Sequence, residues 1–561
     1  MRLADALARV PMRAAFLGGL FAALVTLPGL GIGTLWDNSE TAYGEVAREI
    51  LLSRDWLVMH LNGSEWFVQP PLYFWVAAIF AKIFGVGSFA MRLPSALATI
   101  GMGGAVGYAT ARIAGTRAGI YAAIILSTSL MQAIVGRLAI MDAMLDLAVA
   151  AAVLWWFRAL EPVEDASALA SRKRMAAFIG GAAALALGTL AKGPVAPVVV
   201  FMVVGGWLIW EWRVHRRIVR PSGWGVGAAV VVFLAIAVPW FALLVGRVGI
   251  GAVGELIGHY TVGRYTGVIE NQRGPIWYYV PVLLLGLFPW SAFVPVGLVR
   301  VWREARAPEG ALARLALVWA IVPLVFFSLA QTKLPNYIAL TFPAYAIIAA
   351  LWFERISLGK DRRAALVSAA VVPLTIGLIA IAVVLFGRDN HLTVAIDAVA
   401  PQLVTLAIGM LVGSIATVAV IALPRYRPVA PYVLAVTSLL LVNFIAFVGE
   451  PAAEPLKPIP QLAKIIDAAR KPGDTIAIRG VSGGNALTFY TLPGVKTIDS
   501  DNDQSFYSTI CPTGTSYIVT RRDDVTILQT DAARVRRTLT PLGTVGRAEL
   551  IRIDGRDCPH D

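Results

Sequence analysis

The stretch from Trp36 to Pro71 carries six carboxylates and lies between two apolar segments. Asp37 and Glu40 stand three residues apart, so they share one face where this segment is helical. A further carboxylate, Asp142, lies in the segment GRLAIMDAM. A carboxylate can take the proton from a hydroxyl group, so these residues predict acid–base chemistry at a shared site. The alternative is structural, since an acidic residue at the start of a helix stabilises its dipole or caps it.

Cationic side chains accompany these carboxylates. On the topology derived below, seven of them face the outer side of the membrane, where the positive-inside rule does not explain them. Arg and Lys bind phosphate through charge-assisted hydrogen bonds, whereas snorkelling at a helix end is the structural alternative. Carboxylates and cations together suit a transfer in which a hydroxyl acceptor is deprotonated and a phosphate leaving group is stabilised. The seven residues are Arg92, Arg137, Lys192, His259, Arg264, Arg273 and Lys333.

The composition places these residues in a membrane protein. Of the 561 residues, 58% are hydrophobic and 15% are charged, and the mean hydropathy is +0.71. Charge-free stretches such as 175–191 and 226–245 are long enough to cross a hydrocarbon core of about 30 Å as helices. The net charge of +13 lies mostly in short loops, as the positive-inside rule requires, and does not indicate nucleic-acid binding. The sequence therefore predicts a polytopic α-helical membrane protein.

Hydropathy predicts about thirteen transmembrane helices. The basic N-terminus indicates an uncleaved signal anchor that begins in the cytoplasm. Residues 71–84 are treated as an interfacial helix, because counting them as a span would put Arg112 and Arg117 outside. An odd number of spans leaves the C-terminus outside. The predicted spans are 14–35, 89–111, 118–135, 143–160, 176–191, 194–211, 224–246, 276–299, 312–330, 335–353, 364–387, 401–423 and 430–449.

Two domains follow from this pattern. Residues 1–449 form the predicted transmembrane domain, with 36–88 as its first external loop, and residues 450–561 form a soluble α/β domain. Cys511 and Cys558 both lie in the second domain and can form a disulfide if it faces an oxidising compartment. The Pro-rich stretch PAAEPLKPIP is predicted to be a linker. After it, the patterns predict helices at 461–471 and 531–543 and strands at 475–480, 516–522 and 547–553.

An ordered set of short motifs extends over residues 30–355. It comprises an acidic pair followed by x-x-Tyr, then REIL, SRDWLV, LNG, PPLYFW, FAMRLPSAL, R-x-A-x-x-D, KGP, RGPIWYYVPVLLLGLFPW and KLPNY. In this order the motifs resemble the bacterial glycosyltransferases related to protein O-mannosyltransferases and to the lipid A aminoarabinose transferase, which have the GT-C fold. The resemblance implies an inner-membrane enzyme that transfers a sugar, with inversion, from a polyprenyl-phosphate carrier. The acceptor, a glycolipid such as lipid A, a polysaccharide or a protein, is then modified at the periplasmic face.

The resemblance also implies roles for particular residues. The family's base is the Asp of an Asp-Glu pair, but this chain has Ser39-Glu40 there, so Glu40 or the nearby Asp37 takes over, or the chain is inactive. Asp142 is expected to orient the acceptor. Tyr43 is retained, whereas Gln69 stands where the aminoarabinose branch has a lysine. Both are candidate substrate contacts. The residues expected to hold the donor phosphate are Arg137, Lys192, Lys333 and Tyr337, followed by Arg264, Arg273 and Arg92.

Two rival functions are kept. A transporter or flippase for lipid-linked saccharides would show inverted repeats and charges at mid-membrane depth, whereas the charges here collect at one rim. A catalytically inactive scaffold would bind the donor without turnover. The pair Glu255 and His259 (i, i+4) could bind a divalent metal, but packing on a helix face is favoured, and no metal site is predicted. The sequence does not identify the sugar, the acceptor or the oligomeric state.

Overall fold

A computed structural model describes residues 2–36, 39–161, 168–216, 221, 223–269, 272–386, 393–471, 473–481, 484–491, 495–498, 515–534 and 537–554. The candidate base Asp37 and the predicted disulfide between Cys511 and Cys558 lie outside these described residues. The chain divides into two compact units. The helical unit comprises 1–30, 67–73 and 92–446, and the loop-and-sheet unit comprises 31–66, 74–91 and 447–561.

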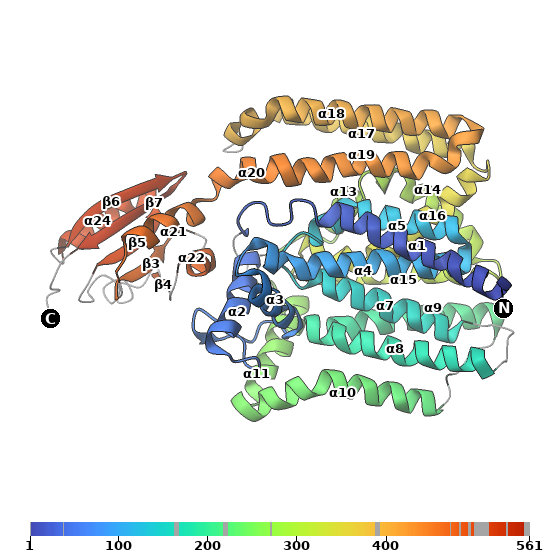
Figure 1. The fold of residues 1–561 in the computed structure, drawn as a ribbon, viewed down its shortest axis with the longest axis horizontal. Helices are drawn as coiled ribbons and strands as arrows, with labels where there is room; N and C mark the ends of the chain where they lie inside the picture. Colours follow the sequence, from blue (N-terminus) through green and yellow to red (C-terminus); the bar gives the residue numbers. More distant parts are fainter. Residues whose placement is uncertain are drawn as a thin grey trace. The chain divides into compact units, whose positions relative to one another are not determined.

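The helical unit is a bundle of long apolar helices. Helices α7, α8 and α10 run side by side (Figure 1), and α1 and α16 both pack against α5. The long helices are α1 (Arg2–Thr26), α4 (Ser88–Ala114), α5 (Thr116–Thr128), α7 (Asp142–Leu160), α8 (Ala168–Lys192), α9 (Val195–His215), α10 (Gly223–Val248), α14 (Val294–Ala305), α15 (Ala311–Leu329), α16 (Phe342–Ser357), α17 (Arg362–Phe386), α18 (Thr393–Ala422) and α19 (Ala430–Phe444).

Shorter helical segments join the long helices. Four of the nine lie between predicted spans and five lie within them, and η1 and η5 are π-helices. They are α6 (Leu130–Val135), α11 (Ile250–Gly254), η1 (Glu255–Gly263), α12 (Arg264–Thr266), α13 (Tyr279–Gly286), η2 (Trp290–Phe293), η3 (Pro335–Thr341), η4 (Pro424–Val429) and η5 (Ile445–Gly449).

Within the described residues, nine helices are long and apolar enough to cross a membrane, and a bent pair makes a tenth. A multi-span membrane protein is therefore confirmed. Each of the thirteen predicted spans contains helix, but their number as membrane crossings stays a prediction. Helix α3 (Leu72–Phe84) has 13 residues and is about 20 Å long, too short for a core of about 30 Å.

Three predicted spans differ clearly from the structure. The segment 118–135 was predicted as one span, but Ser129, with an extended backbone (φ −67°, ψ 133°), separates α5 from α6. The segment 276–299 was predicted as one span, but it breaks between α13 and Trp290, where the two helical parts are bent by 108°. Pro289 lies in this break and cannot donate a backbone hydrogen bond. The first span was predicted to reach residue 35, but α1 ends at Thr26. Pro28 disfavours helix in the residue before it, and Gly29 has φ +66°.

The loop-and-sheet unit combines part of the first loop with the C-terminal residues. From the loop come α2 (Ser39–Ser53) and a hairpin of β1 (His60–Leu61) and β2 (Ser64–Glu65). Asn62 and Gly63, with φ 56° and 76°, form the hairpin's tight turn. The C-terminal elements are α20 (Glu450–Ala453), η6 (Glu454–Leu456), α21 (Pro458–Ala469), β3 (Thr475–Arg479), α22 (Gly484–Tyr490), β4 (Val495–Ile498), β5 (Ser516–Arg521), η7 (Arg522–Asp524), α24 (Val525–Arg534), β6 (Thr538–Val545) and β7 (Ala548–Asp554).

The five-stranded sheet has the order β4-β3-β5-β7-β6, parallel among the first three strands and antiparallel among the last three. The predicted helix at 461–471 and all three predicted strands are confirmed. The predicted helix at 531–543 is wrong in its second half, because α24 ends at Arg534 and strand β6 follows. Pro541 fits there because β6 is an edge strand with an irregular register beside that residue. The predicted linker PAAEPLKPIP is instead helical, in α20, η6 and the start of α21.

Candidate active site

Asp142 and Lys192 form an ion pair at one end of the neighbouring helices α7 and α8. Asp142 is the first residue of α7, Lys192 is the last residue of α8, and Lys192 Nζ lies 2.6 Å from Asp142 Oδ1. The Asp142 side chain is 5% exposed and the Lys192 side chain 14%. The carboxylate is also favoured by its place at a helix N-terminus. The structure thus brings together one predicted carboxylate and one predicted phosphate-binding cation.

Tyr337 and Arg264 complete this group, which we call the Asp142 site (Asp142, Lys192, Arg264 and Tyr337). Lys192 Nζ lies 5.2 Å from the centre of the Tyr337 ring. Arg264 Nη1 donates to Tyr337 Oη at 3.3 Å and to Gln272 Oε1 at 3.4 Å. These are long hydrogen bonds, and a phosphate oxygen would be a stronger partner for the guanidinium.

Backbone hydrogen bonds hold the two cationic loops against each other. The amide of Thr332 donates to Arg264 O at 3.1 Å, and the amide of Lys333 donates to Gln272 O at 2.8 Å. Arg273 and Thr332 form a β-bridge. The predicted segments around Arg264–Arg273 and Lys333–Tyr337 therefore meet, as a shared phosphate site requires.

Lys333 differs from Lys192 in where its ammonium points. It is 5% exposed and donates to Ser328 O at 2.9 Å and, at shorter range, to Ala330 O. Burial lowers the pKa of Lys333 below its ordinary value. Arg273 is exposed to solvent. Direct phosphate contacts by Lys333 and Arg273 stay predictions.

Pro70, the residue after the predicted substrate contact Gln69, and the π-helix η1 lie close to Gly193, next to Lys192 of the Asp142 site. Pro70, which follows Gln69, approaches Gly193 to within 4.0 Å of where a Cβ would stand, and Leu256 and Thr261 of η1 approach the same point. Gly193 directly follows Lys192 and has φ +63°. Glu255 and His259 also lie on η1, but no group of three or more metal-ligating side chains occurs among the described residues.

Arg92 and Arg137 hold the end of helix α1. Arg137 Nη1 donates to three carbonyl oxygens there, including Pro28 O at 2.7 Å, and Arg92 Nη1 donates to Leu30 O at 3.3 Å. Arginine commonly satisfies the last carbonyls of a helix. This geometry favours a structural role, and their predicted contact with the donor phosphate stays a prediction.

Asp146 is a site residue that the sequence reasoning missed. It lies one turn after Asp142 on α7 and is 1% exposed. Electrostatic interactions link it to both Asp142 and Lys192. A carboxylate inside an apolar span is costly unless it is functional or paired. The spacing D-x-x-x-D in DAMLD was the signal, since i and i+4 share one face of a helix.

Glu40 and Tyr43 lie on α2 in the loop-and-sheet unit. Glu40 is 1% exposed, and its Oε2 accepts a hydrogen bond from the Trp36 amide at 2.9 Å, which closes the start of the helix. Tyr43 packs edge-on against Trp66 and Phe74, with ring centres 6.2 and 5.8 Å apart. Glu40 therefore has a structural partner beside its predicted catalytic role, and neither role excludes the other.

The fold places the chain in a class. It matches the structure of ArnT from Cupriavidus metallidurans bound to undecaprenyl phosphate, with a TM-score of 0.81 over 95% of this chain and 97% of that chain at 22% identity. The same protein in the apo state gives a TM-score of 0.77. The chain is thus a polytopic membrane protein of the GT-C fold, and the predicted fold class is confirmed.

Sequence comparison sharpens this class. Residues 68–242 match the family model of dolichyl-phosphate-mannose-protein mannosyltransferase. The chain is similar to the undecaprenyl phosphate-alpha-4-amino-4-deoxy-L-arabinose arabinosyl transferases of Erwinia tasmaniensis (30% identity over 66% of this chain) and Edwardsiella ictaluri (31% over 64%). The alignments span 64% and 62% of these relatives' own length. The resemblance to the aminoarabinose transferases is confirmed.

Proposed function

We propose that this chain is an integral-membrane glycosyltransferase that moves a sugar from polyprenyl (undecaprenyl) phosphate to an acceptor at the periplasmic face of the bacterial inner membrane. The Asp142 site is the observation that carries the proposal, because the Asp142 carboxylate pairs with Lys192, and Lys192 lies over the ring of Tyr337, whose hydroxyl accepts from Arg264. The names of the similar proteins support the carrier, and the fold supports the class.

In the proposed reaction the acceptor oxygen attacks the anomeric carbon while the bond from that carbon to the phosphate oxygen breaks. The acceptor's proton passes to a carboxylate, and the leaving polyprenyl phosphate takes the electron pair. Lys192 and Arg264 stabilise the charge that develops on the phosphate. Glu40 and Asp37 stay the candidates for the base, and Asp142 orients the acceptor. The periplasmic orientation and the domain boundary at 449/450 belong to this proposal.

The test uses the purified full-length protein with a synthetic polyprenyl-phosphate sugar and an acceptor panel of lipid A, polysaccharide and peptide. We expect release of polyprenyl phosphate together with glycosylation of one acceptor class. Donor binding without turnover on any acceptor would instead favour the inactive scaffold. Movement of the intact donor across a vesicle membrane, without cleavage, would favour a flippase.

A further inference from the structure

The backbone just before α2 forms hydrogen bonds with side chains from the C-terminal part of the same unit. The Thr34 amide donates to Glu454 Oε2 at 3.0 Å, and Thr34 O accepts from Lys457 Nζ at 2.9 Å. The Leu35 amide donates to Tyr490 Oη at 2.8 Å. These partners lie more than 400 residues away along the chain, so the extended segment 34–36 is fixed by side chains rather than by a sheet or helix.

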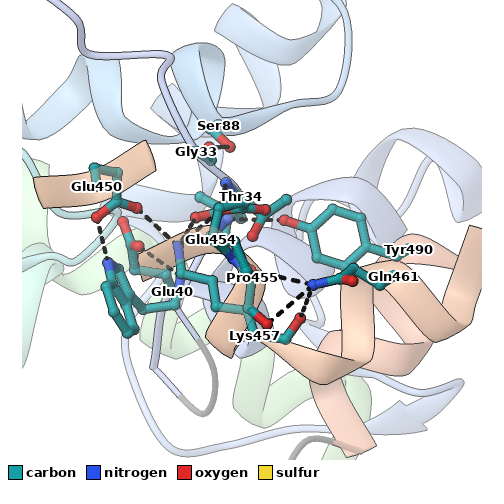
Figure 2. Close-up of polar contacts among 12 residues, drawn as sticks. Gly33, Thr34, Glu40, Ser88, Glu450, Glu454, Pro455, Lys457, Gln461 and Tyr490 are labelled. Atoms are coloured by element: carbon teal, nitrogen blue, oxygen red, sulfur yellow. Dashed lines mark hydrogen bonds and ion pairs between the residues drawn. The ribbon is translucent and has the colours of Figure 1, made fainter. Parts of the chain in front are cut away.

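Lys457 is the centre of this arrangement (Figure 2). Its Nζ lies 2.7 Å from Glu450 Oε1, 3.3 Å from Glu454 Oε2 and 4.1 Å from the centre of the Trp36 ring. Trp36 Nε1 in turn donates to Glu450 Oε2 at 3.1 Å. The Lys457 side chain is only 8% exposed, so its charge is held by these partners rather than by water. We call Trp36, Glu450, Glu454 and Lys457 the clasp.

Gly33 leaves the space that the clasp needs. Its φ is +72°, and a Cβ there would lie 2.6 Å from both Cγ and Oε1 of Glu450. A side chain at this position would therefore be strained and would displace the Glu450 carboxylate. Ser88 Oγ donates to Gly33 O at 2.8 Å and fixes the same turn from the other side.

Trp36 connects the clasp to Glu40. The Trp36 amide, between the clasped indole and the start of α2, donates to Glu40 Oε2 at 2.9 Å. Helix α2 itself is seated on α22, where the Arg48 guanidinium donates to Thr488 O at 3.2 Å and pairs with Glu45. A Cβ on Gly44 would lie 2.9 Å from the Phe489 ring, so the two helices touch closely. The clasp thus adjusts only the first residues of a helix that is anchored independently.

We propose that Lys457 is a positioning residue of the transferase, which holds Trp36 through the clasp and thereby sets the carboxylate of Glu40. This inference rests on the proposed function and adds to it that the C-terminal segment belongs to the catalytic apparatus. A charged side chain that only stabilised the fold would affect the amount of folded protein. A positioning residue affects the turnover of the folded protein, because a displacement of about 1 Å costs on the order of 100-fold in rate.

The experiment compares three variants of the full-length protein. Lys457→Met keeps the length of the side chain and removes its charge, Lys457→Arg restores a cation, and Lys464→Met is the matched control at an exposed lysine of α21. Turnover and donor KM are measured with a polyprenyl-phosphate sugar. Hydrogen–deuterium exchange over residues 33–42 is measured on the same samples without substrate.

Lys457→Met is expected to lower kcat at least 10-fold with donor KM unchanged, and to raise exchange over 33–42 but not over 43–53. Lys457→Arg should recover part of the loss, and Lys464→Met should match the wild type. Unchanged kcat in Lys457→Met would overturn the positioning role. Exchange that rises over the whole of α2 and α22 would also overturn it, in favour of a role in folding.

The two proposals fail in different ways. A wild-type protein that transfers no sugar contradicts the proposed function, and no turnover comparison then exists. Exchange over 33–42 still reports whether Lys457 fixes this segment. A wild type that transfers sugar, together with a fully active Lys457→Met, contradicts only the positioning role.

Discussion

The Asp142 site and the clasp both combine carboxylates, a lysine and an aromatic ring, but the lysine has different surroundings in each. In the clasp one ammonium contacts two carboxylates, a carbonyl and an indole, all between 2.7 and 4.1 Å. In the Asp142 site the Lys192 ammonium contacts one carboxylate at 2.6 Å and a tyrosine ring at 5.2 Å, and the Arg264 hydrogen bonds given above are longer than 3.2 Å. The Lys192 side chain is also more exposed than that of Lys457, at 14% against 8%.

This difference distinguishes cationic side chains that stabilise the local structure from cationic side chains that can bind an anionic ligand. A lysine with several close oxygen partners would lose them on binding an anion, so little free energy is gained. A lysine such as Lys192, for which a single carboxylate lies within hydrogen-bond distance, gains further charge-assisted contacts when a phosphate arrives. By the same criterion Arg92 and Arg137 resemble Lys457 of the clasp, because they already donate hydrogen bonds to backbone carbonyl oxygens.

The largest expected effect is at the Asp142 site. Asp142→Asn removes the charge opposite Lys192 while keeping the shape of the side chain, so turnover should fall on the order of 1,000-fold. Initial rates of polyprenyl-phosphate release measure this. The matched control is Asp467→Asn on α21, whose carboxylate is 41% exposed and pairs with Arg470. If Asp142→Asn keeps a rate within about threefold of the wild type, the Asp142 site is not the functional site.

The ion pair of Arg314 with Glu211 tests the other category, cationic side chains that stabilise the structure. Arg314 is completely buried and binds Glu211 through two hydrogen bonds of 2.7 and 2.9 Å. Glu211→Gln removes the counter-charge of the buried guanidinium, which keeps its hydrogen bonds to three carbonyl oxygens, and should cost about 3 kcal/mol of stability, measured by thermal unfolding in detergent. Glu304→Gln is the control, because Glu304 is 34% exposed and lies 3.2 Å from Arg355. Its loss should be under about 1 kcal/mol. Equal losses would show that burial does not separate the two kinds of pair.

Glu40 has both a structural hydrogen bond and a predicted catalytic role, and Glu40→Gln distinguishes the two. Glutamine keeps an oxygen that can accept the Trp36 amide, so the start of α2 should survive while the proton-accepting charge is lost. We expect turnover to fall about 100-fold with an unchanged melting temperature. Asp37→Asn is assayed alongside. Full activity in both variants would exclude the two first-loop carboxylates as the base.

The smallest effect is the pH response of the clasp. Burial favours the neutral form of Glu454, but hydrogen bonds from Thr34 and the Lys457 ammonium outweigh it, so the pKa of Glu454 is lowered below its ordinary value of 4.5. The charges facing it are those of Lys457 and, through Lys457, Glu450. With a lowered folded-state pKa, the stabilisation is present above about pH 4.5 and is lost as the pH falls through the folded value.

Melting temperatures of the wild type and Glu454→Gln check this response. Glutamine keeps an acceptor for the Thr34 amide but has no charge to titrate. The wild type should be the more stable of the two at pH 7, and the gap should narrow steadily below about pH 4.5. A gap that is constant with pH would mean that the Glu454 charge contributes nothing to the clasp.

Sequence patterns predicted the parts of the fold that depend on local regularity. Long apolar runs predicted the helices, and short runs rich in Ile, Val, Tyr and Thr predicted strands β3, β5 and β7. The break between α13 and Trp290 was missed because hydropathy is averaged over a window, and the two parts together are apolar enough to pass as one span. The predicted helix at 531–543 failed because it joined the polar end of one element to the start of the next.

The site was predicted only in part. The predicted outer side of the membrane grouped Lys192 with Arg264, and the family resemblance added Tyr337, but neither separated these residues from Arg137. A guanidinium binds a carbonyl oxygen and a phosphate oxygen by the same chemistry, and only coordinates show which is near. The clasp was not predictable, because its partners are 414 to 423 residues apart and proline made 451–460 look like a linker.

That sequence separation has a consequence for biosynthesis. Lys457 is translated more than 400 residues after Trp36, an interval of roughly 20 to 85 s at about 5–20 residues per second. The residues that bind the Thr34 and Leu35 amides in the folded protein, Glu454 and Tyr490, are likewise translated more than 400 residues after them. Residues 34–36 of a nascent chain therefore make these contacts only after the C-terminal segment has been translated, and a chain that ends before Glu450 cannot make them.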